Sequence, residues 1–375
     1  MTPRHDRVWA LVAGGGTAGH VLPAVAAAAA LVERGHAAES ISFVGSSRGL
    51  EARLVPEAGF SITLLPGRGI ARRLTLDNAG AVAGLLWAIG RAFVLTARRR
   101  PAVVLSVGGY ASVPCAAAAV ALRVPLVLHE QNAVPGLANR LAARFARASG
   151  VSFAGTALPR AIVTGNPVRP DVLAVDRSAT GRRAARAALG LPADATVIAV
   201  FGGSLGARRI NEATFGLVER WAARPGVAVR HAVGARDWAA VVGRLPAVPP
   251  GGLTYDAVEY EERMPTLYAA ADVVVGRAGG TTVAELAAAG VPSVLVPLPG
   301  APNDHQTANA KALVDAGAAV LVPDGELTAE RLAGELDALV GDPERLAAMG
   351  DAGRRIARPD AAERVAELVE RHARQ

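Results

Sequence analysis

A glycine-rich turn near the amino terminus is the first feature of the sequence that could do chemistry. Gly14, Gly16 and Gly19 follow the apolar run "VWALVA" and precede a helix-like run, which is the G-x-G-x-x-G spacing of dinucleotide-binding proteins. That fingerprint also needs a carboxylate about 20 residues further on, after the second strand, to bind the ribose. The expected second strand, "SISFVG", is followed by "SSRG", which contains no carboxylate. Arg48 in that segment could bind a 2′-phosphate, so an NADP-dependent oxidoreductase stays an alternative.

His20 directly follows the last glycine of this turn and is not explained by the fingerprint. It would lie in the first turn of the helix and point toward whatever the turn binds. The positive end of a helix disfavours a protonated imidazole, so we expect a neutral base near neutral pH. A histidine that only caps or packs against the helix is the alternative.

Three further segments could bind a nucleotide sugar. In "FGGSLGARRIN" glycines surround Ser204 at the start of a helix, where backbone amides and a hydroxyl suit a phosphate. In "RAGGTTVAE" a glycine turn precedes Glu285, whose carboxylate could accept both hydroxyls of a ribose. "NDHQTANA" gathers Gln306 and other polar side chains that suit sugar hydroxyls. Plain tight turns and helix caps are the alternatives for all three segments.

The elements that must position these turns are short strands, because each turn follows an apolar run and precedes a helical one. This alternation predicts βαβ units and parallel sheets covered by helices on both faces. Two prolines in "TGNPVRPDV", residues 164–172, indicate a boundary. We therefore expect an α/β fold of two Rossmann-like domains that face a cleft, with ligands at the carboxyl ends of the strands. The expected domains are residues 1–166 and 167–350, and a final helix in 351–375 is expected to return to the first domain.

Composition narrows the class of protein. The 375 residues suffice for two domains, and 51% hydrophobic with only 4% aromatic residues predicts a core of Ala, Val and Leu. The single cysteine, Cys115, excludes an internal disulfide framework. A net charge of +7 favours anionic partners. The amino terminus has no signal-peptide layout, and Arg91 interrupts the most apolar stretch, residues 79–97, so we expect no membrane span.

Seven motifs together resemble one family. They are "GGGTAGHVLPA", "SVGGYASVP", "HEQNAVPGLANR", "TGNPVR", "FGGSLGARRIN", "RAGGTTVAELAAAGVPSVLVPLP" and "DHQTANA". Their order and span resemble the membrane-associated N-acetylglucosamine (GlcNAc) transferases of peptidoglycan synthesis, in glycosyltransferase family 28. The resemblance implies a B-type glycosyltransferase fold. It also implies inverting transfer of GlcNAc from UDP-GlcNAc to the 4-hydroxyl of N-acetylmuramic acid (MurNAc) on a polyprenyl diphosphate. A UDP-GlcNAc 2-epimerase, which shares the fold, is the closest rival.

The resemblance also assigns residues to the donor and the acceptor. The donor residues it implies are Thr17, Ala18, Gly19, Asn132, Arg169, Ser204, Glu261, Gly280, Thr281, Thr282, Glu285 and Gln306. Within that set Glu285 would bind the ribose, and Gln306 with Asn132 the GlcNAc hydroxyls. Glu261 stands where the family's backbone meets uracil and where an apolar side chain is usual. Gly108, Gly109 and Tyr110 would form the loop that faces the acceptor or its diphosphate.

Two side chains are candidates for the base that deprotonates the acceptor hydroxyl. We favour His20, and Glu130 in "HEQN" is the alternative if burial raises its pKa. No Asp-x-Asp occurs in the chain, so we expect no metal ion and no cofactor. Glycine-turn amides, a helix end and Arg169 would stabilise the leaving diphosphate instead.

The acceptor's polyprenyl chain implies contact with a membrane. Arg72, Arg73, Leu76 and Trp87 lie in an apolar, arginine-rich stretch that suits peripheral attachment to anionic lipid. An ordinary helix packed on its sheet is the alternative. The expected location is the cytoplasmic face of the cell membrane. The expected partners are UDP-GlcNAc, the polyprenyl-diphosphate-linked MurNAc-pentapeptide and an anionic membrane surface, with no nucleic acid.

Overall fold

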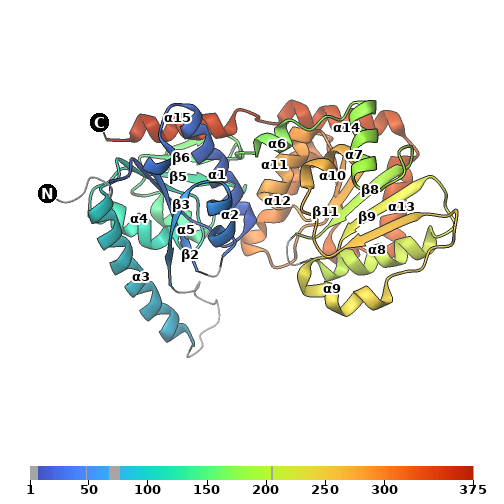
Figure 1. Cartoon of the computed structure of the whole chain (residues 1–375), viewed down its shortest axis with the longest axis horizontal. Helices are drawn as coiled ribbons and strands as arrows, with labels where there is room; N and C mark the ends of the chain where they lie inside the picture. Colours follow the sequence, from blue (N-terminus) through green and yellow to red (C-terminus); the bar gives the residue numbers. More distant parts are fainter. Residues whose placement is uncertain (1–6, 48, 67–76, 204–205, 375) are drawn as a thin grey trace. The chain divides into compact units, whose positions relative to one another are not determined.

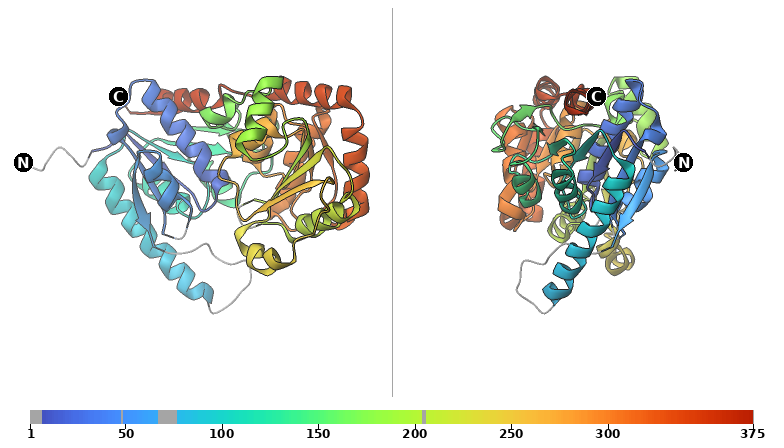
Figure 2. Two further views of the ribbon diagram at one scale, coloured as in Figure 1. Left: turned by 45° about the vertical axis from the view of Figure 1, so that its right-hand side comes forward. Right: turned by 90° about the vertical axis from the view of Figure 1, so that its left-hand side faces the viewer.

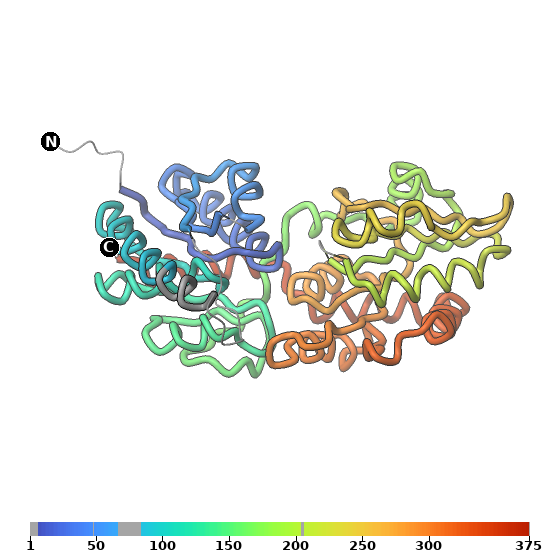
Figure 3. The backbone as a smooth tube through the Cα atoms, turned by 90° about the horizontal axis from the view of Figure 1, so that it is seen from below, coloured from blue at the N-terminus to red at the C-terminus, as the bar shows by residue number. Residues whose placement is uncertain are grey.

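The computed structural model describes residues 7–47, 49–66, 77–203 and 206–374. Within the chain two compact units are distinguished: unit 1 comprises Met1–Arg169 and Arg358–Gln375, and unit 2 comprises Pro170–Ala357. The chain passes between the units twice, after Arg169 and after Ala357 (Figure 3). Each unit is an α/β layer structure built on its own parallel sheet, so the predicted fold class is confirmed.

Unit 1 contains a seven-stranded sheet in the order β3-β2-β1-β4-β5-β6-β7, and every neighbouring pair is parallel. Its strands are β1 (Ala10–Ala13), β2 (Ile41–Ser46), β3 (Ser61–Leu65), β4 (Val103–Ser106), β5 (Leu126–Glu130), β6 (Ala148–Val151) and β7 (Ala161–Val163). Its helices are α1 (Ala18–Glu33), η2 (Ala38–Ser40), α2 (Glu51–Glu57), α3 (Asp77–Arg99), α4 (Ser112–Ala121), α5 (Leu137–Ala142) and α15 (Ala361–His372).

The two faces of this sheet are covered by different helices, because side chains alternate along each strand. Ala10 and Val12 of β1 face α1, α2 and α15, whereas Leu11 and Ala13 face α3 and α4. The last helix, α15, packs against α1 (Figure 1), and Arg34 donates to Glu370 through Nε at 3.0 Å and Nη2 at 2.8 Å.

Unit 2 contains a six-stranded parallel sheet in the order β10-β9-β8-β11-β12-β13. Its strands are β8 (Thr196–Phe201), β9 (Val227–Ala232), β10 (Thr254–Val258), β11 (Val273–Gly276), β12 (Ser293–Leu295) and β13 (Ala319–Leu321). Its helices are α6 (Pro170–Leu173), α7 (Ala179–Ala188), α8 (Arg208–Arg220), α9 (Ala235–Val241), η3 (Val242–Arg244), α10 (Met264–Ala270), α11 (Gly280–Ala289), η4 (Pro302–Asp304), α12 (His305–Asp315), η5 (Asp324–Glu326), α13 (Ala329–Val340) and α14 (Pro343–Ile356). Its core joins β8, β9, β11 and β12 to α8 and α13.

The strand order reverses once in each sheet, between β1 and β4 in unit 1 and between β8 and β11 in unit 2. Parallel sheets bind ligands beyond the carboxyl ends of the strands at such a reversal. The four glycine turns of the sequence follow these four strands. The fold therefore places all four predicted turns at the two positions where an α/β sheet binds ligands.

The helix α3 extends past the edge of the sheet of unit 1 (Figure 2). Among the residues that the structure describes, no helix combines the length and apolar character needed to cross a membrane. The same residues contain no group of three or more His, Cys, Asp or Glu side chains that could hold a metal ion.

Candidate functional site

The two glycine turns of unit 1 pack backbone against backbone. Gly15 N donates to Gly108 O at 3.3 Å, and Val107 N donates to Ala13 O at 2.9 Å. A Cβ on Gly14 would lie 2.6 Å from Gly108 O, and a Cβ on Gly109 would overlap Gly15 O. Only glycine fits at this crossing, so the turns after β1 and β4 form one continuous backbone surface.

His20 lies in the first turn of α1 beside this surface. Its Nδ1 is 3.1 Å from Thr17 Oγ1. Its Nε2 side faces the second turn, since a Cβ on Gly108 would lie 3.3 Å from His20 Nε2 and 3.5 Å from Asn139 Nδ2. When Nδ1 donates its hydrogen to Thr17, Nε2 carries the lone pair on the side of Gly108.

Glu130, at the end of β5, is buried and accepts four hydrogen bonds. Oε1 accepts from Asn132 N at 3.0 Å and Asn132 Nδ2 at 3.1 Å, and Oε2 accepts from Gly136 N at 3.0 Å and Asn139 Nδ2 at 2.9 Å. The carboxylate therefore holds the loop after β5 in place. Asn139 links it to the surroundings of His20.

His129 and Tyr110 complete the polar structure of this region. Burial lowers the pKa of His129, whose Nε2 donates to Gly165 O at 2.9 Å while Gln131 Nε2 lies 3.1 Å from Nδ1. Tyr110 donates its hydroxyl to Pro66 O at 3.3 Å, and burial raises its pKa. Both side chains stay neutral near neutral pH and serve as fixed hydrogen-bonding groups.

In unit 2 the glycine turn after β8 is supported by a buried network. Ser204 lies outside the described residues, but the flanking Gly206 packs against Val233 O and Asp237. Asn211 of α8 donates to Val233 O at 3.0 Å and to Asp237 Oδ2 at 3.1 Å, and its Oδ1 is 3.0 Å from His231 Nε2. Burial lowers the pKa of His231 to about 3, so the ring is neutral at ordinary pH.

The turn after β11 begins α11 with Gly280. Thr281 and Thr282 follow in its first turn, where the amides and the positive helix end favour an anion. Glu285 is buried on the same helix, and its Oε2 accepts the Tyr268 hydroxyl at 2.8 Å. Tyr268, in α10, is fully buried and fixes the orientation of this carboxylate.

Gln306 lies in the first turn of α12 and binds the neighbouring backbone. Its Oε1 accepts from Ala278 N at 3.2 Å and from Leu298 N at 3.0 Å. Asn309, one turn further, donates to Ala278 O at 3.0 Å. These two amides tie the loop after β12 to the turn after β11.

Glu261 lies apart from those turns, in the segment between β10 and α10. Its Oε2 accepts from Arg230 Nε at 2.9 Å and its Oε1 from Arg263 N at 3.0 Å. The side chain is buried in this ion pair and is therefore not available to a ligand. Arg169, half-buried, is the last residue of the first segment of unit 1, directly before the chain enters unit 2.

Two carboxylates that the sequence analysis did not select also hold predicted ligand-binding turns. Glu51 accepts from Gly16 N in the first glycine turn. Asp324 pairs with Arg277 at 2.6 Å, and Arg277 Nη1 donates to Val296 O at 3.0 Å. Glu51 stands five residues after the end of β2, beyond the segment "SSRG" in which the dinucleotide fingerprint requires its carboxylate.

An apolar surface lies on the α3–α4–α5 face of unit 1. Trp87 of α3 is 54% exposed, whereas Arg72, Arg73 and Leu76 lie outside the described residues. Leu86, Phe93 and Val94 are also exposed on α3. A groove of about 370 Å³ runs between α4 and α5. It is lined by Val113, Ala116, Ala117, Val120, Ala121, Ala138, Leu141, Ala142 and Phe145.

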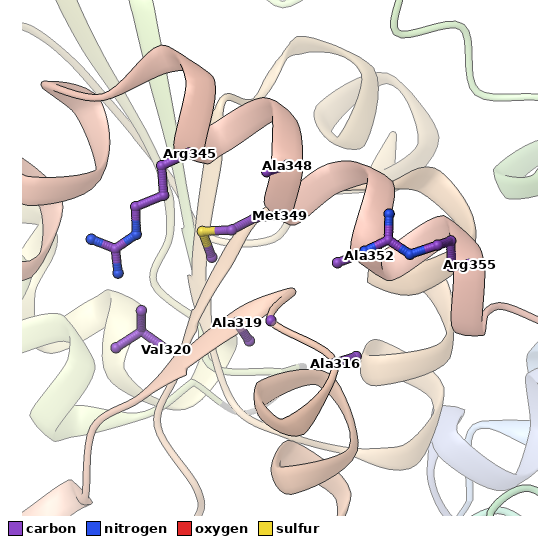
Figure 4. A pocket seen from close by; sticks show the side chains of 9 residues that line it. Ala316, Ala319, Val320, Arg345, Ala348, Met349, Ala352 and Arg355 are labelled. Carbon is purple, nitrogen blue, oxygen red and sulfur yellow. The ribbon is translucent and has the colours of Figure 1, made fainter.

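A pocket of about 410 Å³ in unit 2 is unrelated to these turns (Figure 4). It lies between α14 and the amino end of β13, at the sheet edge opposite to the glycine turns. Its lining is small and apolar, with Arg345 and Arg355 as the two charged members.

Two family models match the chain. The model of the glycosyltransferase family 28 N-terminal domain matches residues 10–151, and that of the C-terminal domain matches residues 197–365. Both matches cover a switch point and its two glycine turns.

Relatives with one name match the chain over nearly its whole length. A protein of Nocardioides sp. is 44% identical over 90% of this chain and 91% of its own length, and one of Acidothermus cellulolyticus is 43% identical over 97% of both. Each is named UDP-N-acetylglucosamine–N-acetylmuramyl-(pentapeptide) pyrophosphoryl-undecaprenol N-acetylglucosamine transferase.

Solved structures agree with this similarity. The crystal structure of Acinetobacter baumannii MurG is 30% identical, with a TM-score of 0.73 over 97% of this chain and 99% of that one. A UDP-GlcNAc 2-epimerase from Neisseria meningitidis has a TM-score of 0.66 over 97% of this chain and all of its own, but it is only 14% identical, so it shares the fold alone.

Proposed function

Because the chain belongs to glycosyltransferase family 28, we propose that it transfers GlcNAc from UDP-GlcNAc to the 4-hydroxyl of MurNAc in polyprenyl-diphosphate-linked MurNAc-pentapeptide. This is a hexosyl transfer of peptidoglycan synthesis. The observation that carries it is the match of 90–97% of the chain, at 39–44% identity, to relatives that bear this activity in their name. The epimerase alternative is supported only by the shared fold.

The donor binds mainly to unit 2 in this proposal. The first turn of α11, Gly280 to Thr282, offers amides and hydroxyls at a positive helix end, which suits the diphosphate. Glu285, oriented by Tyr268, accepts the ribose hydroxyls. The Oε1 of Gln306 is engaged by two backbone amides, so its amino group is the part directed at a GlcNAc hydroxyl.

The remaining donor contacts follow the family resemblance. Ser204 and Arg169 contact the diphosphate, the backbone at Glu261 contacts the uracil, and Asn132 contacts a GlcNAc hydroxyl. The burial of the Glu261 side chain against Arg230 supports a main-chain role at that position. Thr17, Ala18 and Gly19, at the start of α1, approach the diphosphate or the acceptor.

The acceptor hydroxyl is deprotonated by His20. Its Nε2 lies on the side of the Gly108 turn, and its Nδ1 is held by Thr17. The oxygen attacks the anomeric carbon, the bond from that carbon to UDP breaks, and configuration inverts. The proton passes to Nε2, and the electron pair leaves with UDP. Both oxygens of Glu130 accept hydrogen bonds from the loop after β5 and from Asn139 of α5, which favours a positioning role over that of the base.

The acceptor's headgroup faces the loop of Gly108, Gly109 and Tyr110, and its polyprenyl chain stays in the membrane. The α4–α5 groove lies next to that loop, because α4 begins directly after it, and α3 packs against α4 on the same unit. Arg91, Arg140 and Arg144 are exposed near these apolar side chains and suit anionic headgroups. The protein therefore attaches peripherally to the cytoplasmic face of the membrane.

Release of UDP tests the proposed reaction. We expect UDP to appear only when UDP-GlcNAc and the lipid-linked MurNAc-pentapeptide are both present. Release without the acceptor, or conversion of UDP-GlcNAc to its 2-epimer, would show hydrolysis or epimerisation in place of transfer.

Sedimentation with vesicles tests the membrane contact. We expect binding to vesicles that contain anionic lipid, weakened by salt. Trp87→Glu should reduce binding about tenfold, since it removes an exposed apolar anchor and adds a negative charge. Val242→Glu, at an exposed apolar position of unit 2, is the matched control. An equal loss of vesicle binding in both variants would contradict the assignment of the α3 surface as the membrane contact.

A further inference from the structure

Glu51 is a buried carboxylate inside the first glycine turn. It is the first residue of α2, and its side chain is turned back toward the sheet, with 1% of the residue exposed. Oε2 accepts from Gly16 N at 2.7 Å, and Oε1 accepts from Ser46 N at 2.7 Å. One carboxylate therefore joins the turn after β1 to the carboxyl end of β2, and the two strands are paired neighbours in the sheet.

Three glycines make room for this carboxylate. A Cβ on Gly15, Gly45 or Gly49 would overlap the side chain of Glu51. Gly15 and Gly16 also have φ of 144° and 101°, which side-chain-bearing residues rarely adopt. The chain thus wraps the carboxylate from β1, from β2 and from the segment that leads into α2.

The position of the carboxylate is informative. In a dinucleotide-binding turn, the amides after the first strand bind the phosphates of the ligand. In this chain the Gly16 amide is already bonded to an internal anion. Burial of a carboxylate is unfavourable unless it is hydrogen-bonded, and two short charge-assisted bonds supply that compensation.

We propose that Glu51 is a positioning residue that fills the anion site of the first glycine turn. It fixes the backbone that leads into Thr17 and His20, and it keeps ligand phosphate away from the Gly16 amide. Diphosphate recognition in unit 1 consequently falls to groups other than that amide. The effect of Glu51 on turnover rests on the proposed function, whereas its effect on the turn does not.

Two variants and one control separate positioning from folding. Glu51→Gln keeps the size of the side chain but sets an amide N–H against one of the two backbone N–H donors. Glu51→Ala removes a group with the size and charge of acetate. Glu57→Gln, at the other end of α2, removes an exposed partner of Arg53 and is the matched control.

Hydrogen exchange tests the structural part. In Glu51→Gln we expect faster exchange at the amides of Gly16 and Ser46 and across residues 14–20, with exchange in α11 unchanged. Glu57→Gln should leave both regions as in the wild type. Unchanged exchange at Gly16 and Ser46 in Glu51→Gln would overturn the proposal, whatever the enzyme's activity.

Turnover with added acetate tests the functional part. We expect Glu51→Gln and Glu51→Ala to lower kcat by about tenfold to a hundredfold, because small misplacements of reacting groups have such effects. The KM for UDP-GlcNAc should change by less than about twofold, since the donor's proposed contacts lie mainly in unit 2. Acetate, but not chloride, should restore part of the lost kcat of Glu51→Ala. Acetate should leave the kcat of the control Glu57→Gln unchanged.

The outcomes distinguish the two proposals. A folded Glu51→Ala protein with wild-type kcat, or one whose lost rate acetate does not restore, would overturn the positioning role. A rise in the KM for UDP-GlcNAc as large as the fall in kcat would also overturn the positioning role, because it would indicate a general loss of structure. A wild-type protein that releases no UDP with both substrates would contradict the proposed function, and the exchange comparison would still test Glu51.

Discussion

The two units have the same arrangement of strands around their switch points, but they use buried glutamates differently. In unit 1, Glu51 and Glu130 accept hydrogen bonds from backbone amides and so shape the turns around them. In unit 2, Glu285 lies within α11 and accepts a hydrogen bond from the Tyr268 side chain. The first glycine turn and the loop after β5 of unit 1 are thus held by buried glutamates. Glu285 follows a glycine turn of unit 2, is bonded to the Tyr268 side chain, and is the residue that we propose binds the ribose.

This difference matches the division of work in the proposed reaction. The base in unit 1 must be held within a fraction of an ångström to act on the acceptor hydroxyl, which favours a turn fixed by internal bonds. The donor's diphosphate and ribose need amides and a carboxylate at the start of a helix, which α11 provides. Variants that affect kcat alone should therefore lie in unit 1, and variants that affect donor binding should lie in unit 2.

The largest expected effect is at His20. His20→Ala should lower kcat by about a hundredfold to ten-thousandfold, because it removes the general base, and leave the affinity for UDP-GlcNAc unchanged. Steady-state kinetics and titration with UDP-GlcNAc measure the two quantities. His36→Ala, which removes a histidine at the other end of unit 1 that contacts Glu370, is the control. Wild-type turnover in His20→Ala would contradict the assignment of the catalytic base to unit 1.

The next effect is at Glu285. Glu285→Ala should raise the KM for UDP-GlcNAc by about tenfold to a hundredfold, the value of hydrogen bonds to a charged group. It should also abolish the preference for UDP-GlcNAc over its 2′-deoxyribose analogue, because the lost partner is the ribose hydroxyl. A variant that keeps this preference would show that the carboxylate does not bind the ribose. Glu330→Gln, an exposed carboxylate of the same unit, should behave as the wild type.

The effect at Glu130 should be on stability first. Glu130→Ala leaves the amides of Asn132 and Gly136 and the side chain of Asn139 without their acceptor. The free energy of unfolding should fall by about 1–3 kcal/mol, measured by urea denaturation. Unchanged stability with a large loss of kcat would instead support Glu130 as the base.

The last effect is confined to acidic pH and concerns the buried His231 of unit 2. Burial lowers its pKa to about 3, below the ordinary 6.5, so the unfolded chain takes up a proton in this range that the folded chain does not. Its contribution to stability is complete above about pH 6.5 and is lost as the pH falls toward 3, by at most about 1.4 kcal/mol per pH unit. Urea denaturation between about pH 7 and about pH 4 measures the slope. His231→Asn should reduce it, and an unchanged slope would contradict this assignment.

The fold could be predicted from the sequence because its signals are local. Apolar runs such as "VWALVA" and "TVIAVF" stand directly before glycine turns, and both became strands at a switch point. His20 could be selected for a similar reason, since its place after Gly19 fixes it in the first turn of α1.

The hydrogen-bond partners could not be predicted, because they depend on tertiary contacts. Glu51 lies five residues after the end of β2, and nothing in "SRGLEAR" distinguishes a buried carboxylate from a solvated one. Only the nearby Gly45 and Gly49 hint that something bulky packs there. The contact between Tyr268 and Glu285 likewise depends on a tertiary contact, the packing of α10 beside α11.

Transfer of labelled GlcNAc tests the central claim most directly. The protein is incubated with UDP-GlcNAc labelled in the sugar and with polyprenyl-diphosphate-linked MurNAc-pentapeptide, and the lipid is then extracted. The account predicts that the label enters the lipid fraction as GlcNAc joined to the 4-hydroxyl of MurNAc with inverted anomeric configuration. Label that stays in the aqueous phase, as UDP-sugar or free sugar, would contradict it.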